Sequence, residues 1–175
     1  SLSEEERKLG CSADWNAYTG KQNVPPSTTE YFRTGSGHVH VGFDLSNLSS
    51  RDLYEKDIRD RVKQLDRVLY LPSLLWDSSK KRRTLYGKPG AFRYKPYGFE
   101  YRVLSNSWLS DPDLQVWVYE ATMVAMKLYD QGVYLWDDVP LSEEYDRKSL
   151  ESYTRALHTN YGIPSLPFVA ISIAA

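Results

Sequence analysis

Two short stretches of the chain alternate polar with apolar side chains in the way that β-strands do. His38 and His40 share a face of the first stretch, and Glu100 and Arg102 share a face of the second. A carboxylate and a guanidinium on a mostly apolar strand are costly to bury without partners. Two imidazoles on another strand complement the carboxylate as ligands of a divalent metal ion, with the arginine beside it. This combination of side chains indicates a site for anionic substrates, phosphates above all.

Further cations precede the second stretch, in a segment that contains glycines. Arg83, Lys88 and Arg93 are spaced through this segment, which leads into the strand that carries Glu100. Arginine forks match the oxygens of phosphate and carboxylate groups, and lysine supplies a point charge. We therefore expect these three cations to bind a ligand, whereas residues 80–82 are expected to form a solvated basic surface.

Structural roles are the alternatives for these residues. The imidazoles of His38 and His40 can make cross-strand hydrogen bonds instead of binding a metal ion. Glu100 can form a structural salt bridge with Arg102 on the same face of its strand. The sequence leaves both alternatives open.

The composition is that of an ordinary soluble globular protein, and it narrows the classes of partner. The 175 residues are 41% hydrophobic and 26% charged, and their formal net charge is −1. This charge gives no reason to expect nucleic acid or an anionic membrane as a partner, and the apolar run at 168–175 is too short to span a bilayer. The single cysteine, Cys11, excludes an intrachain disulfide and favours a reducing compartment. We therefore expect a cytoplasmic protein without nucleic-acid or membrane partners.

Apolar periodicity and capping residues predict the elements that position these side chains. The expected strands lie at 37–45 and 99–104, and the expected helices at 3–9, 50–69, 112–130 and 142–157. Residues 11–30 are predicted to be an extended loop, residues 80–98 a basic loop, and residues 158–175 a loosely docked tail. The prediction is an α+β fold, with an antiparallel sheet and packed helices in a single domain over residues 1–175.

The predicted sheet is small for the helices that must pack on it. Two or three strands cannot cover the apolar faces of four helices. We therefore expect further sheet from an identical copy in a homo-oligomer, or from another chain that supplies a missing N-terminal half.

Three motifs together resemble those of a known enzyme family. Residues 35–42 (Gly-Ser-Gly-His-Val-His-Val-Gly), 83–93 and 95–106 look like the phage-type carboxylate–amine ligases, the amidoligases of the glutamine synthetase and glutamate–cysteine ligase superfamily. The resemblance spans about residues 10–108. It implies the C-terminal part of a glutamine-synthetase-like catalytic domain and the ATP-dependent formation of an amide or peptide bond. In such enzymes ATP phosphorylates a carboxylate, an amine attacks the acyl phosphate, and Mg²⁺ ions bridge phosphates and protein carboxylates.

The resemblance implies a metal site formed by Glu100 and a histidine, either His38 or His40. Glu100 resembles the metal-binding glutamate of the Glu-x-Arg strand, and one of His38 and His40 resembles the strand histidine near the metal and the γ-phosphate. Family members carry additional metal-binding carboxylates on strands at the start of the domain, and no such pattern precedes Gly35. The chain therefore resembles the C-terminal half to two-thirds of a ligase.

The resemblance also assigns cations to the other reactants. Arg102 resembles the arginine beside the transferring phosphate or substrate, and Arg83 and Arg93 resemble the cations that hold the ATP phosphates and the carboxylate substrate. Lys88 lies in the same segment and is expected to assist them. The resulting prediction is a ligase that uses ATP and Mg²⁺ on small-molecule or peptide carboxylates and amines, with Arg93 and Arg102 as catalytic residues. The alternative is a non-catalytic binding or assembly module built on the same scaffold.

Overall fold

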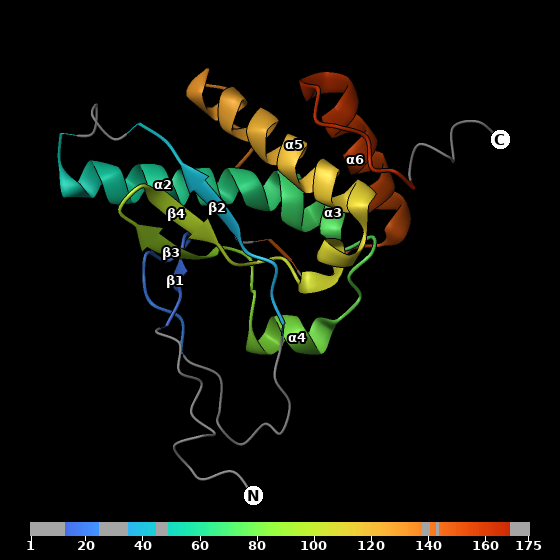
Figure 1. Cartoon of the computed structure of the whole chain (residues 1–175), viewed down its shortest axis with the longest axis horizontal. Helices are drawn as coiled ribbons and strands as arrows, with labels where there is room; N and C mark the ends of the chain where they lie inside the picture. The colour runs from blue at the N-terminus through green and yellow to red at the C-terminus, as the bar shows by residue number, and fades with distance from the viewer. Residues whose placement is uncertain (1–12, 25–34, 45–48, 138–140, 143, 169–175) are drawn as a thin grey trace, which may run out of the picture.

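The computed structural model of the chain describes residues 13–24, 35–44, 49–137, 141–142 and 144–168. It shows an antiparallel sheet with helices packed on it, which confirms the predicted α+β class (Figure 1). The predicted helix at 3–9 and Cys11 lie outside the described residues. No helix in the described ranges combines the length and the apolar character needed to cross a bilayer.

The sheet contains four antiparallel strands in the order β1-β3-β4-β2. The strands are β1 (Trp15–Asn16), β2 (Val39–Gly42), β3 (Ala91–Lys95) and β4 (Gly98–Tyr101). β2 lies within one predicted strand and β4 overlaps the other, whereas β1 and β3 occupy segments that were predicted to be loops. β1 and β2 are the edge strands of the described sheet. Completion of this sheet by another chain or by an identical copy stays a prediction.

Most helix boundaries follow local capping signals. The helical segments are α2 (Arg51–Leu65), a π-helical turn (Asp66–Tyr70), α3 (Leu71–Ser73), α4 (Lys80–Leu85), a 3-10 turn (Asn106–Ser110), α5 (Pro112–Asp130) and α6 (Arg147–Tyr161). Ser50 caps α2 and Asp111 caps α5, because each side chain accepts hydrogen bonding from backbone N–H in the first turn of its helix. Two predictions were wrong: α6 begins after its cap Asp146 rather than at Ser142, and the predicted basic loop contains α4.

The first long helix does not stop at residue 69, where it was predicted to end, but continues past Pro72. Proline has no backbone N–H to donate and its ring crowds the carbonyl one turn earlier. The π-helical turn Asp66–Tyr70 precedes it, and α3 then carries Pro72 in its first turn, a position that proline tolerates. The local change of helical pitch therefore lets the helix pass the proline.

The core lies between α2 and one face of the sheet. Ile58 and Val62 of α2 are fully buried, as are Phe92, Phe99 and Tyr101 of β3 and β4. α5 packs against α2, and α6 packs against α3. The tail also contributes to this core: Ile163 and Leu166 are almost completely buried. Residues 163 and 166 are thus packed into the core, whereas residues 158–175 were predicted to dock loosely.

One ionisable side chain is enclosed in this core. Asp66 is completely buried and accepts hydrogen bonds from the hydroxyl groups of Tyr101 (2.7 Å) and Tyr18 (3.0 Å). Burial raises the pKa of Asp66 to about 7, although these hydrogen bonds and the charge of Arg67 oppose the shift. A neutral carboxyl group at this position is therefore favoured below neutral pH.

We expect this carboxyl group to make the stability of the fold depend on pH. An unfolded aspartate titrates near pH 4, so between about pH 4 and pH 7 the folded state binds the proton more tightly. The free energy of unfolding should therefore fall as the pH rises through this window, by at most about 1.4 kcal/mol per pH unit. Urea unfolding at pH 5, 6 and 7 tests this, since Asp66→Asn should flatten the dependence. An unchanged dependence in the variant would assign it to other groups.

Candidate functional site

The face of the sheet opposite α2 carries charged side chains. Strand alternation points Phe92 and Tyr101 towards the core, so that the intervening residues point to the other face. Glu100 pairs with Arg93 on one neighbouring strand and with His40 on the other. Three polar side chains from β2, β3 and β4 therefore form one row across the sheet. We call this surface the polar sheet face.

Glu100 is the centre of this face. One of its carboxylate oxygens lies 2.7 Å from the Lys95 ammonium group. The other lies 2.7 Å from Nδ1 of His38 and also contacts the guanidinium group of Arg102. Burial raises the pKa of Glu100, but the hydrogen bond and charge of Lys95 and the neighbouring histidines outweigh it, so the pKa lies below its usual value. Glu100 is thus a buried, ionised carboxylate with cationic partners.

His38 links Glu100 to the ring of Tyr86. Burial and the charge of Arg102 lower the pKa of His38 to about 4, so its ring is neutral at pH 7. Nδ1 contacts a carboxylate that can only accept, while Nε2 lies 3.2 Å from the Tyr86 hydroxyl. These partners favour the tautomer in which Nδ1–H donates to Glu100 and Nε2 accepts from Tyr86. The Arg102 guanidinium also lies 5.2 Å from the centre of the Tyr86 ring.

Two arginines converge on a second carboxylate. Oδ1 of Asp14 lies 2.7 Å from Nε of Arg102 and 3.2 Å from Nε of Arg93. Burial raises the pKa of Asp14 by more than the charges of these arginines lower it. The two guanidinium groups come from β3 and from the residue after β4, so the sheet itself brings them together around one oxygen atom. This arrangement shows that the polar sheet face can hold a carboxylate between two arginines.

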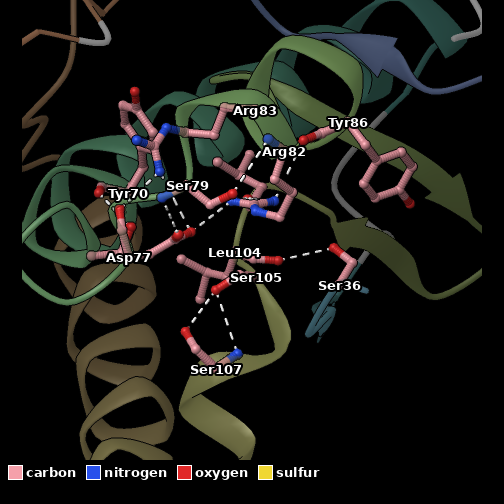
Figure 2. Close-up of polar contacts among 12 residues, drawn as sticks. Ser36, Tyr70, Asp77, Ser79, Arg82, Arg83, Tyr86, Leu104, Ser105 and Ser107 are labelled. Atoms are coloured by element: carbon pink, nitrogen blue, oxygen red, sulfur yellow. Dashed lines mark hydrogen bonds and ion pairs between the residues drawn. The ribbon is translucent and has the colours of Figure 1, made fainter. Parts of the chain in front are cut away.

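Arg83 belongs to a different cluster, which Figure 2 shows around Asp77. Arg83 donates to the Asp77 backbone carbonyl (2.9 Å), and its guanidinium lies 3.5 Å from the Asp77 carboxylate. Arg82, predicted to be solvated, is also buried: it contacts the same carboxylate (2.9 Å) and donates to the carbonyl of Val103 (3.1 Å). Helix α4 therefore directs both arginines into the protein rather than towards the polar sheet face.

A glycine allows the chain to pass this cluster closely. Gly87 has a φ of +79°, a backbone conformation that side-chain-bearing residues rarely adopt. A Cβ atom there would lie 2.8 Å from the carbonyl oxygen of Val103 and closer still to the Arg82 guanidinium. The absence of a side chain at Gly87 thus leaves room for the Arg82 guanidinium.

The structure leaves two other predicted residues at the margin of the polar sheet face. Lys88 is exposed in the turn between α4 and β3. His40 is exposed, and its Nδ1 lies 2.5 Å from the hydroxyl of Tyr97 at the tip of the β3–β4 hairpin. The structure brings four of the seven predicted site residues together through shared partners: His38, Arg93, Glu100 and Arg102. Arg83 is not among them.

Three members of this site were not predicted from the sequence. Lys95 shares the strand parity of Arg93, which was an available signal. Tyr86 lies in the recognised glycine-containing segment, but nothing local indicates its contact with His38. Asp14 carries no recognisable signal, because its pairing with Arg102 joins residues far apart in the chain. The omissions of Tyr86 and Asp14 concern partners that only non-local pairing supplies.

The geometry fits an anion better than a metal ion. In the described part of the chain, no three His, Cys, Asp or Glu side chains gather so that they could hold a metal ion. Both oxygens of Glu100 already contact nitrogen donors, and an added cation would meet the positive charges of Lys95 and Arg102. The cations of the same surface suit phosphate or carboxylate oxygens. The described residues therefore match the phosphate-binding part of the predicted site more closely than its metal-binding part.

Comparison with known families gives a match that covers most of the chain. A family model described as "Phage phiEco32-like COOH.NH2 ligase-type 2" matches residues 26–145, well over half of the chain. No curated protein and no solved structure gives a significant match.

Proposed function

Because the chain belongs to the phage phiEco32-like COOH·NH2 ligase type 2 family, we propose that it joins a carboxylate to an amine in an ATP-dependent reaction. In this reaction the carboxylate takes the terminal phosphoryl group of ATP and releases ADP. The amine then attacks the acyl phosphate, and the amide forms as inorganic phosphate leaves. Small molecules and peptides are both candidates for the carboxylate and the amine.

The observation that carries this proposal is the convergence of Arg93 and Arg102 on one carboxylate oxygen of Asp14. Two guanidinium groups that share one oxygen atom can also hold a substrate carboxylate, or the phosphoryl group that is transferred to it. Phosphoryl transfer depends mainly on positioning and on neutralising negative charge. The polar sheet face offers both, since its cations stand on neighbouring strands of a packed sheet.

Other residues of the polar sheet face hold these cations in position. Glu100 pairs with Lys95 and Arg102, and the neutral His38 lies between Glu100 and Tyr86. Lys95 is partly exposed and can reach an anion while it remains paired. ATP would supply the phosphoryl group, and we assign Arg93, Arg102 and Lys95 to its phosphates and to the carboxylate. Mg²⁺ remains an expectation from the family.

We expect ATP to stabilise the folded protein through Arg93. A ligand that binds only the folded state stabilises it by about 2.7 kcal/mol at a hundredfold excess over its dissociation constant. Thermal unfolding with ATP and Mg²⁺ should therefore show a clear upward shift for the wild type and for Arg51→Ala, a surface control on α2. Arg93→Ala should lose most of the shift.

Product formation separates the ligase from a non-catalytic module on the same scaffold. Incubation with ATP and pools of amino acids and peptides should release ADP and phosphate only when both a carboxylate and an amine are present. Arg93→Ala should abolish this release. An equal thermal shift in Arg93→Ala and wild type would contradict the assignment, and ATP binding without turnover would favour the module.

A further inference from the structure

Asp14 occupies the position that the proposed function assigns to a substrate anion. Its Oδ1 atom lies between Nε of Arg102 (2.7 Å) and Nε of Arg93 (3.2 Å). The proposed function needs both guanidinium groups for the substrate carboxylate, or for the phosphoryl group that is transferred to it. Two anions repel each other strongly at contact distance. The Asp14 side chain and a bound anion therefore compete for one position.

The contact between Asp14 and Arg102 is electrostatic rather than well hydrogen-bonded. Within the residues that the structure describes, neither Oδ1 of Asp14 nor Nε of Arg102 makes a hydrogen bond, although both atoms are buried and lie 2.7 Å apart. The N–H bond of Arg102 is thus poorly aimed at the carboxylate. Arginine binds a carboxylate or a phosphate best through two parallel N–H groups. An added anion, which can choose its orientation, can therefore make better hydrogen bonds here than Asp14 does.

The backbone of Asp14 is held in place, whereas its side chain can rotate. The carbonyl oxygen of Asp14 accepts a hydrogen bond from the backbone N–H of Asn23 (2.7 Å), and the next residue, Trp15, pairs with Phe92 in the sheet. Departure of the carboxylate needs only a change of side-chain rotamer. The carboxylate can therefore leave the two arginines while β1 and the rest of the sheet stay in place.

Exchange of one anion for another keeps the buried arginine neutralised. The side chain of Arg102 is only 4% exposed, and a buried charge that loses its partner destabilises a protein strongly. The side chain of Arg93 is 20% exposed, so an anion from solvent can reach Arg93 first and then replace Asp14 at Arg102. Glu100 also contacts Arg102 and supplies negative charge during the exchange. Replacement of Asp14 by a bound anion therefore leaves the charge balance of the site unchanged.

We propose that Asp14 is a built-in occupant of the ligase anion site, which neutralises Arg93 and Arg102 in the ligand-free protein and is displaced by the reacting anion. This inference rests on the proposed function, because it concerns the regulation of the same site. Asp14 selects against weakly bound anions, since an incoming anion must replace it. An occupant that is in place for about nine-tenths of the time reduces the apparent affinity of a ligand about tenfold.

The test is calorimetric titration of the full chain with inorganic pyrophosphate at constant ionic strength. Asp14→Asn removes the competing charge but keeps the size of the side chain, so it should bind pyrophosphate about tenfold more tightly than the wild type. Asp113→Asn is the matched control: it removes the same charge from an exposed position in the first turn of α5, and it should bind like the wild type. Equal or weaker binding by Asp14→Asn overturns the proposal, and weaker binding would show that Asp14 positions the arginines instead.

A second variant separates displacement from simple charge repulsion. Asp14→Ala makes room for a formate ion in place of the missing carboxylate, so formate should stabilise this variant against thermal unfolding and should weaken its binding of pyrophosphate. In the wild type Asp14 already holds the position, and the same concentration of formate should have little effect. If formate acts on neither protein, or on both equally, Asp14 and the anion do not share one position and the proposal is overturned.

Arg93→Ala separates a failure of this inference from a failure of the proposed function. It should abolish the binding of pyrophosphate, both alone and combined with Asp14→Asn. If Arg93→Ala abolishes the binding but Asp14→Asn does not strengthen it, the anion site stands and only the role of Asp14 is wrong. If neither the wild type nor Asp14→Asn binds pyrophosphate, or if Arg93→Ala binds it like the wild type, the anion site itself is wrong and both proposals fall.

Discussion

The Asp77→Asn variant should lose about 3–5 kcal/mol of unfolding free energy, the range for removing one partner of a buried ion pair. Asp77, Arg82 and Arg83 are all at least 93% buried, and the two guanidinium groups meet at this one carboxylate (Figure 2). Asparagine keeps the shape of the side chain but removes its charge. Its amide nitrogen would also place a donor against the donors of the arginines. The variant leaves both arginines buried without their shared anion.

Chemical denaturation of the variant and of a matched control measures this effect. Glu144→Gln removes the same charge from the partner of Lys80, which belongs to the same helix α4, but in that pair both side chains are exposed. Exposed pairs contribute little, so the control should unfold like the wild type. If Asp77→Asn is as stable as the control, Arg82 and Arg83 do not depend on Asp77, and Arg83 becomes available for the ligand role that the sequence suggested.

The second large effect is expected for Glu100→Gln. Glu100 is 4% exposed and contacts Arg102 and Lys95, so the substitution should cost about 3 kcal/mol, the lower end of the range for a broken buried pair. The lower end applies because Arg102 keeps its contact with Asp14. Loss of the contact with Glu100 should also leave Arg102 less firmly positioned and so reduce the proposed ligase turnover, since this arginine would hold the reacting anion.

The same variant tests the predicted metal role of Glu100. Chemical denaturation reports the stability, and calorimetric titration with Mn²⁺ reports the metal affinity of the wild type and of the variant. We expect reduced stability with little change in Mn²⁺ affinity. A variant that is as stable as the wild type but has lost Mn²⁺ binding would instead identify Glu100 as a metal ligand, with the histidines as its companions.

The predictions that the structure confirms rest on local sequence patterns. The α+β class followed from helical periodicity at α2 and α5 and from alternation around Glu100. The starts of both helices were predictable because Ser50 and Asp111 bond to backbone N–H groups within their own first turns. Strand alternation also placed Glu100 and Arg102 on one face, where the structure shows them in contact.

Two of the wrong predictions concern elements whose stability comes from distant parts of the chain. β1 has two residues and becomes a strand only through its pairing with β3. Helix α4 has six residues, and its basic sequence resembles a surface loop until Asp77 and Val103 provide partners for its arginines. Elements this short gain too little from their own hydrogen bonds to be recognisable alone.

Local sequence patterns are enough to identify the family, the fold class and the charged residues from which a site could be built. The tertiary structure alone decided which of these charges meet. Arg93 and Arg102 converge on Asp14, whereas Arg83 turns inwards to Asp77, although all three arginines look equally suited to phosphate in the sequence. The physical reason is that a buried charge needs a partner within a few ångströms. Strand pairing and helix packing bring that partner from elsewhere in the chain.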